Sequence, residues 1–151
     1  MRLNLPPIEA KLCQSPSGMK IYDPIRQKYV ALTPEEWVRQ HFVQFLIHEK
    51  MVPASLLANE IGLTLNGTRR RCDTVVFNRS ASPVAIVEYK APSVNITQNV
   101  FDQIVRYNMV LHTRYLIVSN GLHHYCCEIL YEQGTYRFLE EVPCYDAMLD
   151  S

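Results

Sequence analysis

Two carboxylates and one lysine lie on two neighbouring apolar segments of this chain. Asp73 precedes the mostly apolar residues 74–77, Glu88 follows the apolar residues 84–87, and Lys90 comes two positions later. Paired carboxylates bind hard divalent cations such as Mg²⁺ through their oxygens. A neighbouring ammonium group stabilises the charge that develops on a phosphate ester under attack. These residue types therefore predict metal-assisted chemistry at a phosphate group.

The two segments are expected to form one antiparallel hairpin. Residues 78–83 between them are rich in residue types that favour turns. If Phe77 lies opposite Val84, counting back along both strands places Asp73 opposite Glu88. Directly opposed residues on one sheet face have Cβ atoms about 4.5–5.5 Å apart. The hairpin thus brings the two carboxylates together.

A second hairpin is predicted immediately before the first. The Asn-Gly pair at positions 66–67 is the strongest short signal for a hairpin turn, and residues 53–65 resolve into the strand before it. Unbulged pairing on both sides of this turn places Glu60 opposite Asp73, in line with Glu88 on the third strand. Glu60 is therefore a candidate metal ligand, although an exposed strand glutamate is the simpler interpretation.

Lys90 has the same strand parity as Glu88 and is expected on the same sheet face. In a catalytic site it would orient the attacking water, help to deprotonate it, or stabilise the phosphate. Alternatively, an ion pair of Lys90 with Asp73 or Glu88 would neutralise the site without any metal. An ion pair of Asp73 with Arg70 is a further alternative, and the sequence leaves all of them open.

Thr33, Pro34 and Glu36 mark the start of a helix. Threonine is a favoured N-cap, proline suits the first helical position, and glutamate at the third position completes a capping box. Apolar residues at helical spacing extend this helix to about residue 50. The capping box gives Glu36 a structural explanation that requires no metal.

A second helix is expected after residue 92. Asn95 with Gln98 three residues later resembles a capping pair. The predicted buried stripe of this helix consists of Val100, Ile104, Tyr107 and Leu111. Gln103 lies four residues before Tyr107 and hence on the same helix face.

The rest of the chain alternates strand patterns with turns, and residues 1–151 are expected to form one domain. Residues 1–20 are interpreted as an extended arm and residues 20–31 as a short hairpin. Further strands are predicted over residues 115–119, 122–131 and 135–140. A helix, a three-stranded meander, a helix and more strands indicate an α/β fold with a mixed β-sheet flanked by helices.

The charge balance restricts how the chain could contact nucleic acid. It has 15 Lys and Arg residues against 15 Asp and Glu, so its formal net charge is zero. Any nucleic-acid contact must then be local. Arg69, Arg70 and Arg71 beside Asp73 form the densest basic run, which is either a solvated strand end or a phosphate contact.

The cysteines and the apolar runs indicate a cytoplasmic protein. Five cysteines, an odd number with no C-x-x-C pair, argue against a disulfide framework or a structural zinc site. Free thiols in a reducing compartment fit best. No apolar run reaches the roughly 20 residues needed to cross a bilayer, so no membrane contact is expected.

The strand-borne Asp73 and the run Glu88-Tyr89-Lys90 resemble the active-site core of the PD-(D/E)XK nucleases. Over most of residues 20–140, the chain resembles the N-terminal nuclease domain of type I restriction enzyme R subunits. The similar stretches are Tyr22-Asp23-Pro24 with Arg26, residues 32–40, the Asp73 strand, residues 88–92, residues 103–107, and Ser119-Asn120-Gly121. One position departs from the pattern: Cys72 stands directly before Asp73, where the PD-(D/E)XK pattern has a proline.

The resemblance implies a restriction-endonuclease-like fold and Mg²⁺-dependent hydrolysis of DNA, with Mn²⁺ as a substitute metal. It implies that Asp73 and Glu88 bind the metal and that Lys90 activates water or balances charge. A glutamate from the first helix often joins the metal site in this broad family. This feature of the family favours Glu36 as a further metal ligand, whereas the strand register favours Glu60.

The resemblance also extends to substrate and partners. Gln103 and Tyr107 have the spacing of a family motif thought to position DNA or brace the site, and Arg70 and Arg71 are candidate phosphate contacts. The chain has no G-x-x-x-x-G-K-[ST] phosphate loop, so a motor or specificity subunit is expected on another chain.

Two further expectations concern the kind of activity. One metal site cuts one strand per visit, so double-strand cleavage requires a homodimer or two encounters. The alternative function is a non-catalytic nucleic-acid- or protein-binding module on the same scaffold. An RNA substrate is a third, less favoured, option.

Overall fold

The computed structural model describes residues 2–150. Its strands are β1 (Leu12–Ser15), β2 (Gly18–Asp23), β3 (Lys28–Ala31), β4 (Leu57–Leu65), β5 (Thr68–Phe77), β6 (Pro83–Tyr89), β7 (Tyr115–Ser119), β8 (His124–Leu130) and β9 (Thr135–Leu139). Its α-helices are α1 (Pro34–His48), α2 (Gln98–Asn108) and α3 (Tyr145–Leu149). Within residues 2–150, no helix combines the length and apolar content that crossing a membrane requires.

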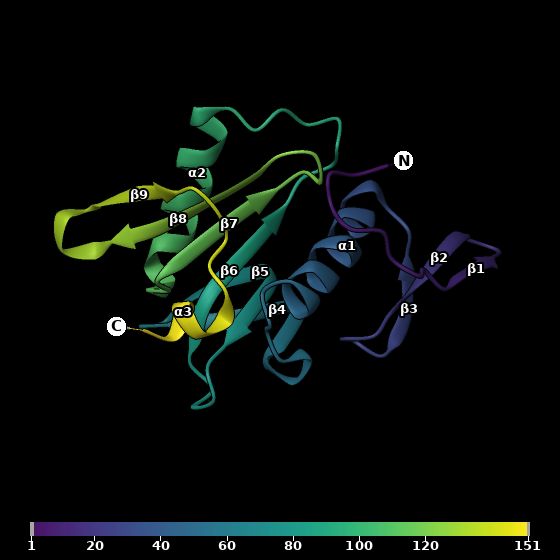
Figure 1. Ribbon diagram of the computed structural model, residues 1–151, viewed down its shortest axis with the longest axis horizontal. Coiled ribbons are helices and arrows are strands. Elements are labelled where there is room, and N and C mark those ends of the chain that lie inside the picture. The colour runs from purple at the N-terminus through teal and green to yellow at the C-terminus, as the bar shows by residue number, and fades with distance from the viewer. Residues whose placement is uncertain (1, 151) are drawn as a thin grey trace.

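A six-stranded mixed sheet organises the fold, in the order β4-β5-β6-β7-β8-β9. All neighbouring strands are antiparallel except β6 and β7, which run parallel and are connected through α2. Helices α1 and α3 pack on one face of the sheet and α2 packs on the other (Figure 1). The structure therefore confirms the expected α/β fold with a mixed sheet flanked by helices.

The hairpin of β5 and β6 has the register that the sequence predicted across its central pairs. Thr74 pairs with Val87, Val75 with Ile86 and Val76 with Ala85, and this ladder ends one residue before Asp73. The prediction was wrong at the loop end, where Phe77 pairs with Pro83 because the register shifts after the preceding residue. The shift lies at the loop end of the hairpin, away from Asp73 and Glu88.

The hairpin of β4 and β5 also has its predicted register, with one interruption. Asn59 pairs with Thr74 and Ile61 pairs with Cys72, but Glu60 and Asp73 between them form no ladder pair. Glu60 has a φ of 55°, in the left-handed region that non-glycine residues seldom adopt. The regular sheet is therefore interrupted at the position of the candidate acidic pair.

Helix α1 begins as its capping sequence predicted. The Thr33 hydroxyl accepts a hydrogen bond from the Glu36 amide at 3.0 Å, and proline occupies the first helical position. The reciprocal half of the capping box does not form, since the Thr33 amide donates to the Ala31 carbonyl instead. The Glu36 side chain is buried and bonds elsewhere.

Helix α2 differs from its prediction in its N-cap and in the exposure of Tyr107. Thr97, and not Asn95, is the N-cap, and its hydroxyl accepts from the Val100 amide at 3.2 Å. The buried positions of the helix are Phe101, Val105 and Asn108. Tyr107, expected in the core, is 47% exposed. Val100 and Ile104 of the predicted stripe do pack against this core and Leu111 is buried, so the stripe was wrong at Tyr107 alone, because Phe101 and Val105 form the centre of the packed face.

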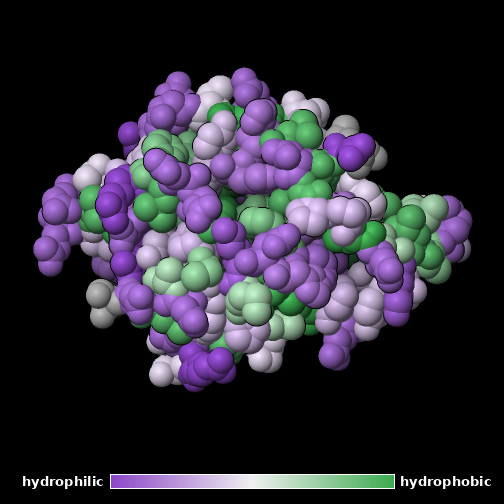
Figure 2. All heavy atoms as spheres, viewed as in Figure 1, coloured by the Kyte–Doolittle hydropathy of each residue, from purple (hydrophilic) through white to green (hydrophobic). Residues whose placement is uncertain are grey.

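A separate three-stranded sheet, ordered β1-β2-β3, lies beside α1 at one end of the molecule (Figure 1). It contains the predicted hairpin of residues 20–31, and its first strand falls within the expected extended arm. On the face shown in Figure 2, hydrophobic residues gather over β1 and β2, where Leu12 and Met19 are large exposed side chains. This sheet contributes Asp23 and Arg26 to the region near the candidate site.

Candidate active site

Asp73 and Glu88 lie together on the adjacent strands β5 and β6. The Asp73 carboxylate accepts a hydrogen bond from the Tyr89 amide at 2.8 Å, which attaches it to the strand that carries Glu88. Both residues are only partly accessible. The structure thus brings together the two acids that the sequence singled out.

The surroundings of Glu88 disfavour the negative charge of its side chain. Its Oε1 atom is buried and has no hydrogen-bond partner. Burial, followed by the charge of Asp73, raises the pKa of Glu88 to about 9, and the nearby charge of Lys90 only partly opposes this. Buried polar atoms nearly always have partners, and a divalent cation between two carboxylates removes their repulsion. The orphaned oxygen therefore fits a bound metal ion.

Lys90 follows directly after β6. Its backbone amide donates to the Ser119 carbonyl at 2.9 Å, which ties it to the end of β7. Its charge acts on Glu88, yet its side chain forms no ion pair with either acid among residues 2–150. The predicted alternative, a lysine–carboxylate pair that neutralises the site by itself, is not formed.

Cys72 is fully buried beside the two acids. Burial, with the added charges of Glu88 and Asp73, raises the pKa of its thiol to about 12. A thiol that stays protonated at neutral pH is a poor nucleophile. Covalent cysteine chemistry is therefore not supported at this site.

Glu36, one of the two candidate additional ligands, is held by cationic and amide donors. Both of its oxygens accept from the Arg26 guanidinium at 2.8 Å, and Arg39 approaches to 3.2 Å. Gln40 donates to the same carboxylate at 2.8 Å. This carboxylate already has its full complement of partners.

Glu60, the other candidate, is held in a similar way. It accepts from Arg39 at 2.7 Å and from Arg71 at 3.2 Å. Burial acts to raise the pKa of Glu60, but the two arginines outweigh it and lower the pKa overall. Within residues 2–150, no group of three or more His, Cys, Asp and Glu side chains is arranged to hold a metal ion. The arrangement therefore does not support a third or fourth carboxylate ligand.

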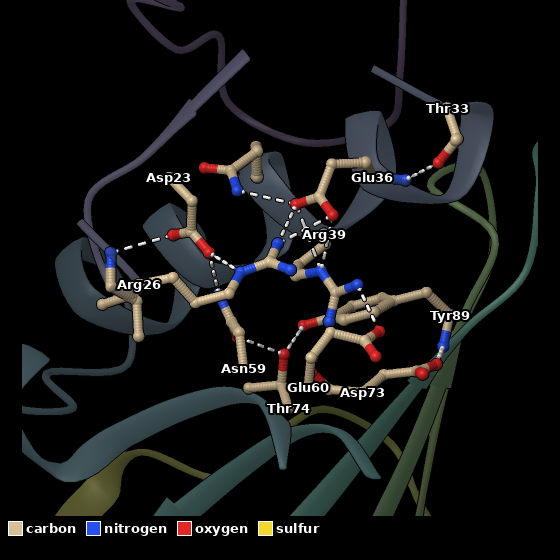
Figure 3. A network of polar contacts seen from close by, with 12 residues as sticks. Asp23, Arg26, Thr33, Glu36, Arg39, Asn59, Glu60, Asp73, Thr74 and Tyr89 are labelled. Carbon is tan, nitrogen blue, oxygen red and sulfur yellow. Dashed lines mark hydrogen bonds and ion pairs between the residues drawn. The ribbon is translucent and has the colours of Figure 1, made fainter. Parts of the chain in front are cut away.

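These contacts form one network of alternating charge between the small sheet and β5 (Figure 3). Asp23 binds Arg26, which binds Glu36, which binds Arg39, which binds Glu60. Arg39 also donates to the main-chain carbonyl of Asp73. The family-like run around Asp23 and Arg26 and the i, i+3 spacing of Glu36 and Arg39 were visible in the sequence, but the network that connects them was not predicted.

A second series of hydrogen bonds connects Tyr89, beside the acidic pair, to Asp23 of the small sheet. The Tyr89 hydroxyl donates to the Thr74 hydroxyl at 2.9 Å, and Thr74 donates to the Asn59 side chain at 2.7 Å. Asn59 in turn donates to Asp23 at 3.0 Å. Burial acts to raise the pKa of Asp23, but its bonds from Arg26 and Asn59 outweigh it and lower the pKa overall. The residues that flank Asp73 and Glu88 are thus fixed from both strands.

The candidate substrate residues lie on the surface. The Arg70 guanidinium stacks 4.6 Å from the centre of the Tyr107 ring, and its Nε donates to the Tyr107 carbonyl at 3.0 Å. Gln103 is exposed on the same helix. Arg71 is largely exposed beyond its bond to Glu60. The structure therefore joins Arg70 to Tyr107 and leaves Gln103 and Arg71 open to solvent.

An open polar groove of about 550 Å³ passes beside Asp73's strand. Its charged lining consists of Arg26, Lys28, Glu36, Arg39, Glu60 and Arg71. Four cationic and two anionic side chains line it, so the groove carries a surplus of positive charge even though Arg26, Arg39 and Arg71 are paired with the two glutamates.

Comparison with solved structures and protein families places this geometry in context. The fragment structure of a putative HsdR subunit of a type I restriction enzyme from Vibrio vulnificus YJ016 is similar, with a TM-score of 0.54 and 21% identity. The match covers 79% of this chain and 25% of that chain, and at this identity it shows the fold alone. No curated protein matches the chain. A model of the type I restriction enzyme R protein N terminus matches residues 34–143. The chain thus belongs to the family of type I restriction enzyme R protein N-terminal domains.

Proposed function

We propose that this domain is a Mg²⁺-dependent endonuclease that hydrolyses DNA phosphodiester bonds, with Mn²⁺ as a substitute metal. The observation that carries the proposal is the buried, unpartnered Oε1 atom of Glu88 next to Asp73. Two acids in this state are stabilised by a shared cation. Membership of the R-protein family supports a nuclease-like domain.

In this proposal Asp73 and Glu88 hold the cation, which when bound would supply an activated water and stabilise negative charge on the phosphate. The Tyr89 amide keeps the Asp73 carboxylate turned toward β6. Lys90 forms no ion pair among the described residues. In the proposal, its ammonium group lies beside the scissile phosphate and balances the charge that develops there.

The same proposal gives Arg70, Arg71, Gln103 and Tyr107 a role in holding the DNA backbone. Stacking on Tyr107 preorganises the Arg70 guanidinium, and arginine suits phosphate because its planar group donates two parallel hydrogen bonds. We further propose that the domain acts in the cytoplasm with a separate motor or specificity subunit, and that double-strand cleavage requires a homodimer or two encounters.

Arg70→Ala is expected to weaken DNA binding and to reduce the salt dependence of binding by about one counterion in the log–log slope, because one phosphate contact is lost. Fluorescence anisotropy at several salt concentrations, with EDTA present to prevent cleavage, measures both quantities. Arg79→Ala is the matched control, because Arg79 is an exposed arginine in the turn at the other end of β5. Equal slopes for the two variants would contradict the assignment.

A calorimetric titration with Mg²⁺ and with Mn²⁺ tests the proposed function directly. It is performed on the wild type, Asp73→Asn and Glu60→Gln, each with and without a non-cleavable phosphorothioate duplex. We expect binding to the wild type, loss of binding in Asp73→Asn, and affinity within a few-fold of wild type in Glu60→Gln, because arginines already hold Glu60. Absence of metal binding by the wild type under both conditions would favour the non-catalytic binding module.

A further inference from the structure

Arg39 is an almost completely buried arginine in the middle of α1, with only 7% of its side chain exposed. Its guanidinium donates to three separate acceptors. Nε approaches Glu36 at 3.2 Å, Nη2 binds Glu60 at 2.7 Å, and Nη1 binds the main-chain carbonyl of Asp73. Its Cζ atom also lies 5.6 Å from the centre of the Tyr89 ring. Figure 3 shows the guanidinium between the helix and the two strands.

The main chain at Asp73 lacks the ladder pairing with β4 that its neighbours in the strand have. Glu60 and Asp73 form no pair in the ladder of β4 and β5, and Glu60 has left-handed backbone geometry. Cys72 and Val75 both pack in the core on the α2 side, although strict alternation would put residues three apart on opposite faces. The strand is thus irregular at the residue whose carboxylate direction matters most.

We infer that Arg39 is a positioning residue of the site, which fixes the main chain of Asp73 and thereby aims its carboxylate toward the Tyr89 amide and Glu88. Its bond to the Asp73 carbonyl supplies an anchor at the interruption of the ladder. Its contact with the Tyr89 ring acts on the residue that donates to the same carboxylate. The catalytic consequence rests on the proposed nuclease function, whereas the structural consequence does not.

Arg39 acts through Asp73 and not on the substrate, because its side chain is buried and each of its three nitrogens already donates to Glu36, Glu60 or the Asp73 carbonyl. Burial acts to lower the pKa of Arg39, but the bond to Glu60 and the charge of Glu36 outweigh it and raise the pKa overall. The group therefore stays charged at neutral pH. Arginine is suited to this position since its planar fork reaches several acceptors in fixed directions.

Arg26 provides a matched control within the same network. It is also a mostly buried arginine, with 15% of its side chain exposed, and it binds Glu36 as Arg39 does. Its other partner is Asp23, and among the described residues Arg26 forms no hydrogen bond, ion pair or cation–π contact with Asp73 or Tyr89. Arg26→Gln and Arg39→Gln therefore remove the same charge from the same network, but only the second removes the anchor at Asp73.

The experiment compares wild type, Arg26→Gln, Arg39→Gln and Arg39→Lys in the full chain. Hydrogen exchange of the Tyr89 amide reports the Asp73 hydrogen bond without any metal or DNA. We expect at least about a tenfold loss of Tyr89 protection in both Arg39 variants relative to the average of the β5 and β6 amides, and no selective loss in Arg26→Gln. Arg39→Lys keeps the charge beside Glu36 and Glu60 but cannot reach all three acceptors, so it separates positioning from charge balance.

Cleavage kinetics provide the second readout. We expect kcat to fall by about 10–100-fold in Arg39→Lys, as is typical when a residue that orients a metal ligand is lost, while KM for DNA changes little. Arg26→Gln keeps kcat within a few-fold of wild type.

If Arg39→Gln does not fold, the result for Arg39→Lys alone tests the positioning role. Normal Tyr89 protection in Arg39→Lys would overturn the inference, as would equal losses in the Arg26 and Arg39 variants. Selective loss of Tyr89 protection in a protein whose wild type neither binds metal nor cleaves DNA would instead refute the nuclease function and retain the positioning role.

Discussion

Asp73→Asn is expected to abolish DNA cleavage while leaving the domain folded. Asparagine has nearly the same shape as aspartate, and its carbonyl oxygen can still accept the hydrogen bond from the Tyr89 amide. The negative charge that would hold a divalent cation is lost. Metal ions contribute several kcal/mol of transition-state stabilisation, so we expect kcat to fall by at least about 10³-fold.

The measurement is cleavage of supercoiled and linear DNA in Mg²⁺ and in Mn²⁺, with circular dichroism and thermal unfolding to confirm the fold. Asp146→Asn is the control, because it removes an exposed carboxylate from the first turn of α3 and should retain wild-type activity. Metal-dependent cleavage that survives in folded Asp73→Asn would refute the assignment of the active site.

Glu88→Gln is expected to stabilise the metal-free protein, and increasingly so as the pH rises. The pKa of Glu88 is about 9 in the folded state against an ordinary value of 4.5. Below pH 4.5 the group is protonated in both states and costs nothing. Between these two values the unfolded chain loses the proton that the folded chain keeps, so the wild type loses up to about 1.4 kcal/mol of stability per pH unit. Glutamine does not titrate, so the variant escapes this loss.

Urea unfolding at pH 5, 6, 7 and 8 in EDTA measures the effect as the difference in unfolding free energy between variant and wild type. Glu132→Gln, at an exposed glutamate in the turn after β8, should show no such slope. Addition of Mg²⁺ should stabilise the wild type by ligand linkage and leave Glu88→Gln unaffected. If the difference in unfolding free energy between Glu88→Gln and wild type does not change with pH, burial and Asp73 do not raise the pKa of Glu88.

Much of the local structure around the site followed from the sequence, because short-range chemistry specifies it. The Asn-Gly pair at positions 66–67 takes positive φ at both residues, as a tight hairpin turn requires. The Thr33-Pro34 start of α1 follows from the N-cap hydroxyl and the fixed φ of proline. Period-two alternation sets strand register, since a slip of one residue would expose the buried face. Together these features predicted that Asp73 and Glu88 lie close together on adjacent strands, as the contact of Asp73 with the Tyr89 amide confirms.

The orientation of α2 could not be read from the sequence in the same way. Val100 and Ile104 pack at the margin of a face that is centred on Phe101 and Val105. The fit of the Phe101 ring among the aromatic side chains of β8 and β9 sets this centre. Tyr107 consequently lies outside, where it stacks with Arg70.

The sequence by itself thus determined the family, the mixed α/β fold and the pairing of two acids with a nearby lysine, because caps, turns and alternation act over a few residues. The tertiary structure alone decided the partners of Glu36 and Glu60. Arginines from α1, β5 and the turn after β2 bind them. The i, i+3 pair of Glu36 with Arg39 is local, but the contacts of Glu36 with Arg26 and of Glu60 with Arg39 depend on the packing of segments distant in sequence. The same packing set Arg39 against the irregular main chain of Asp73.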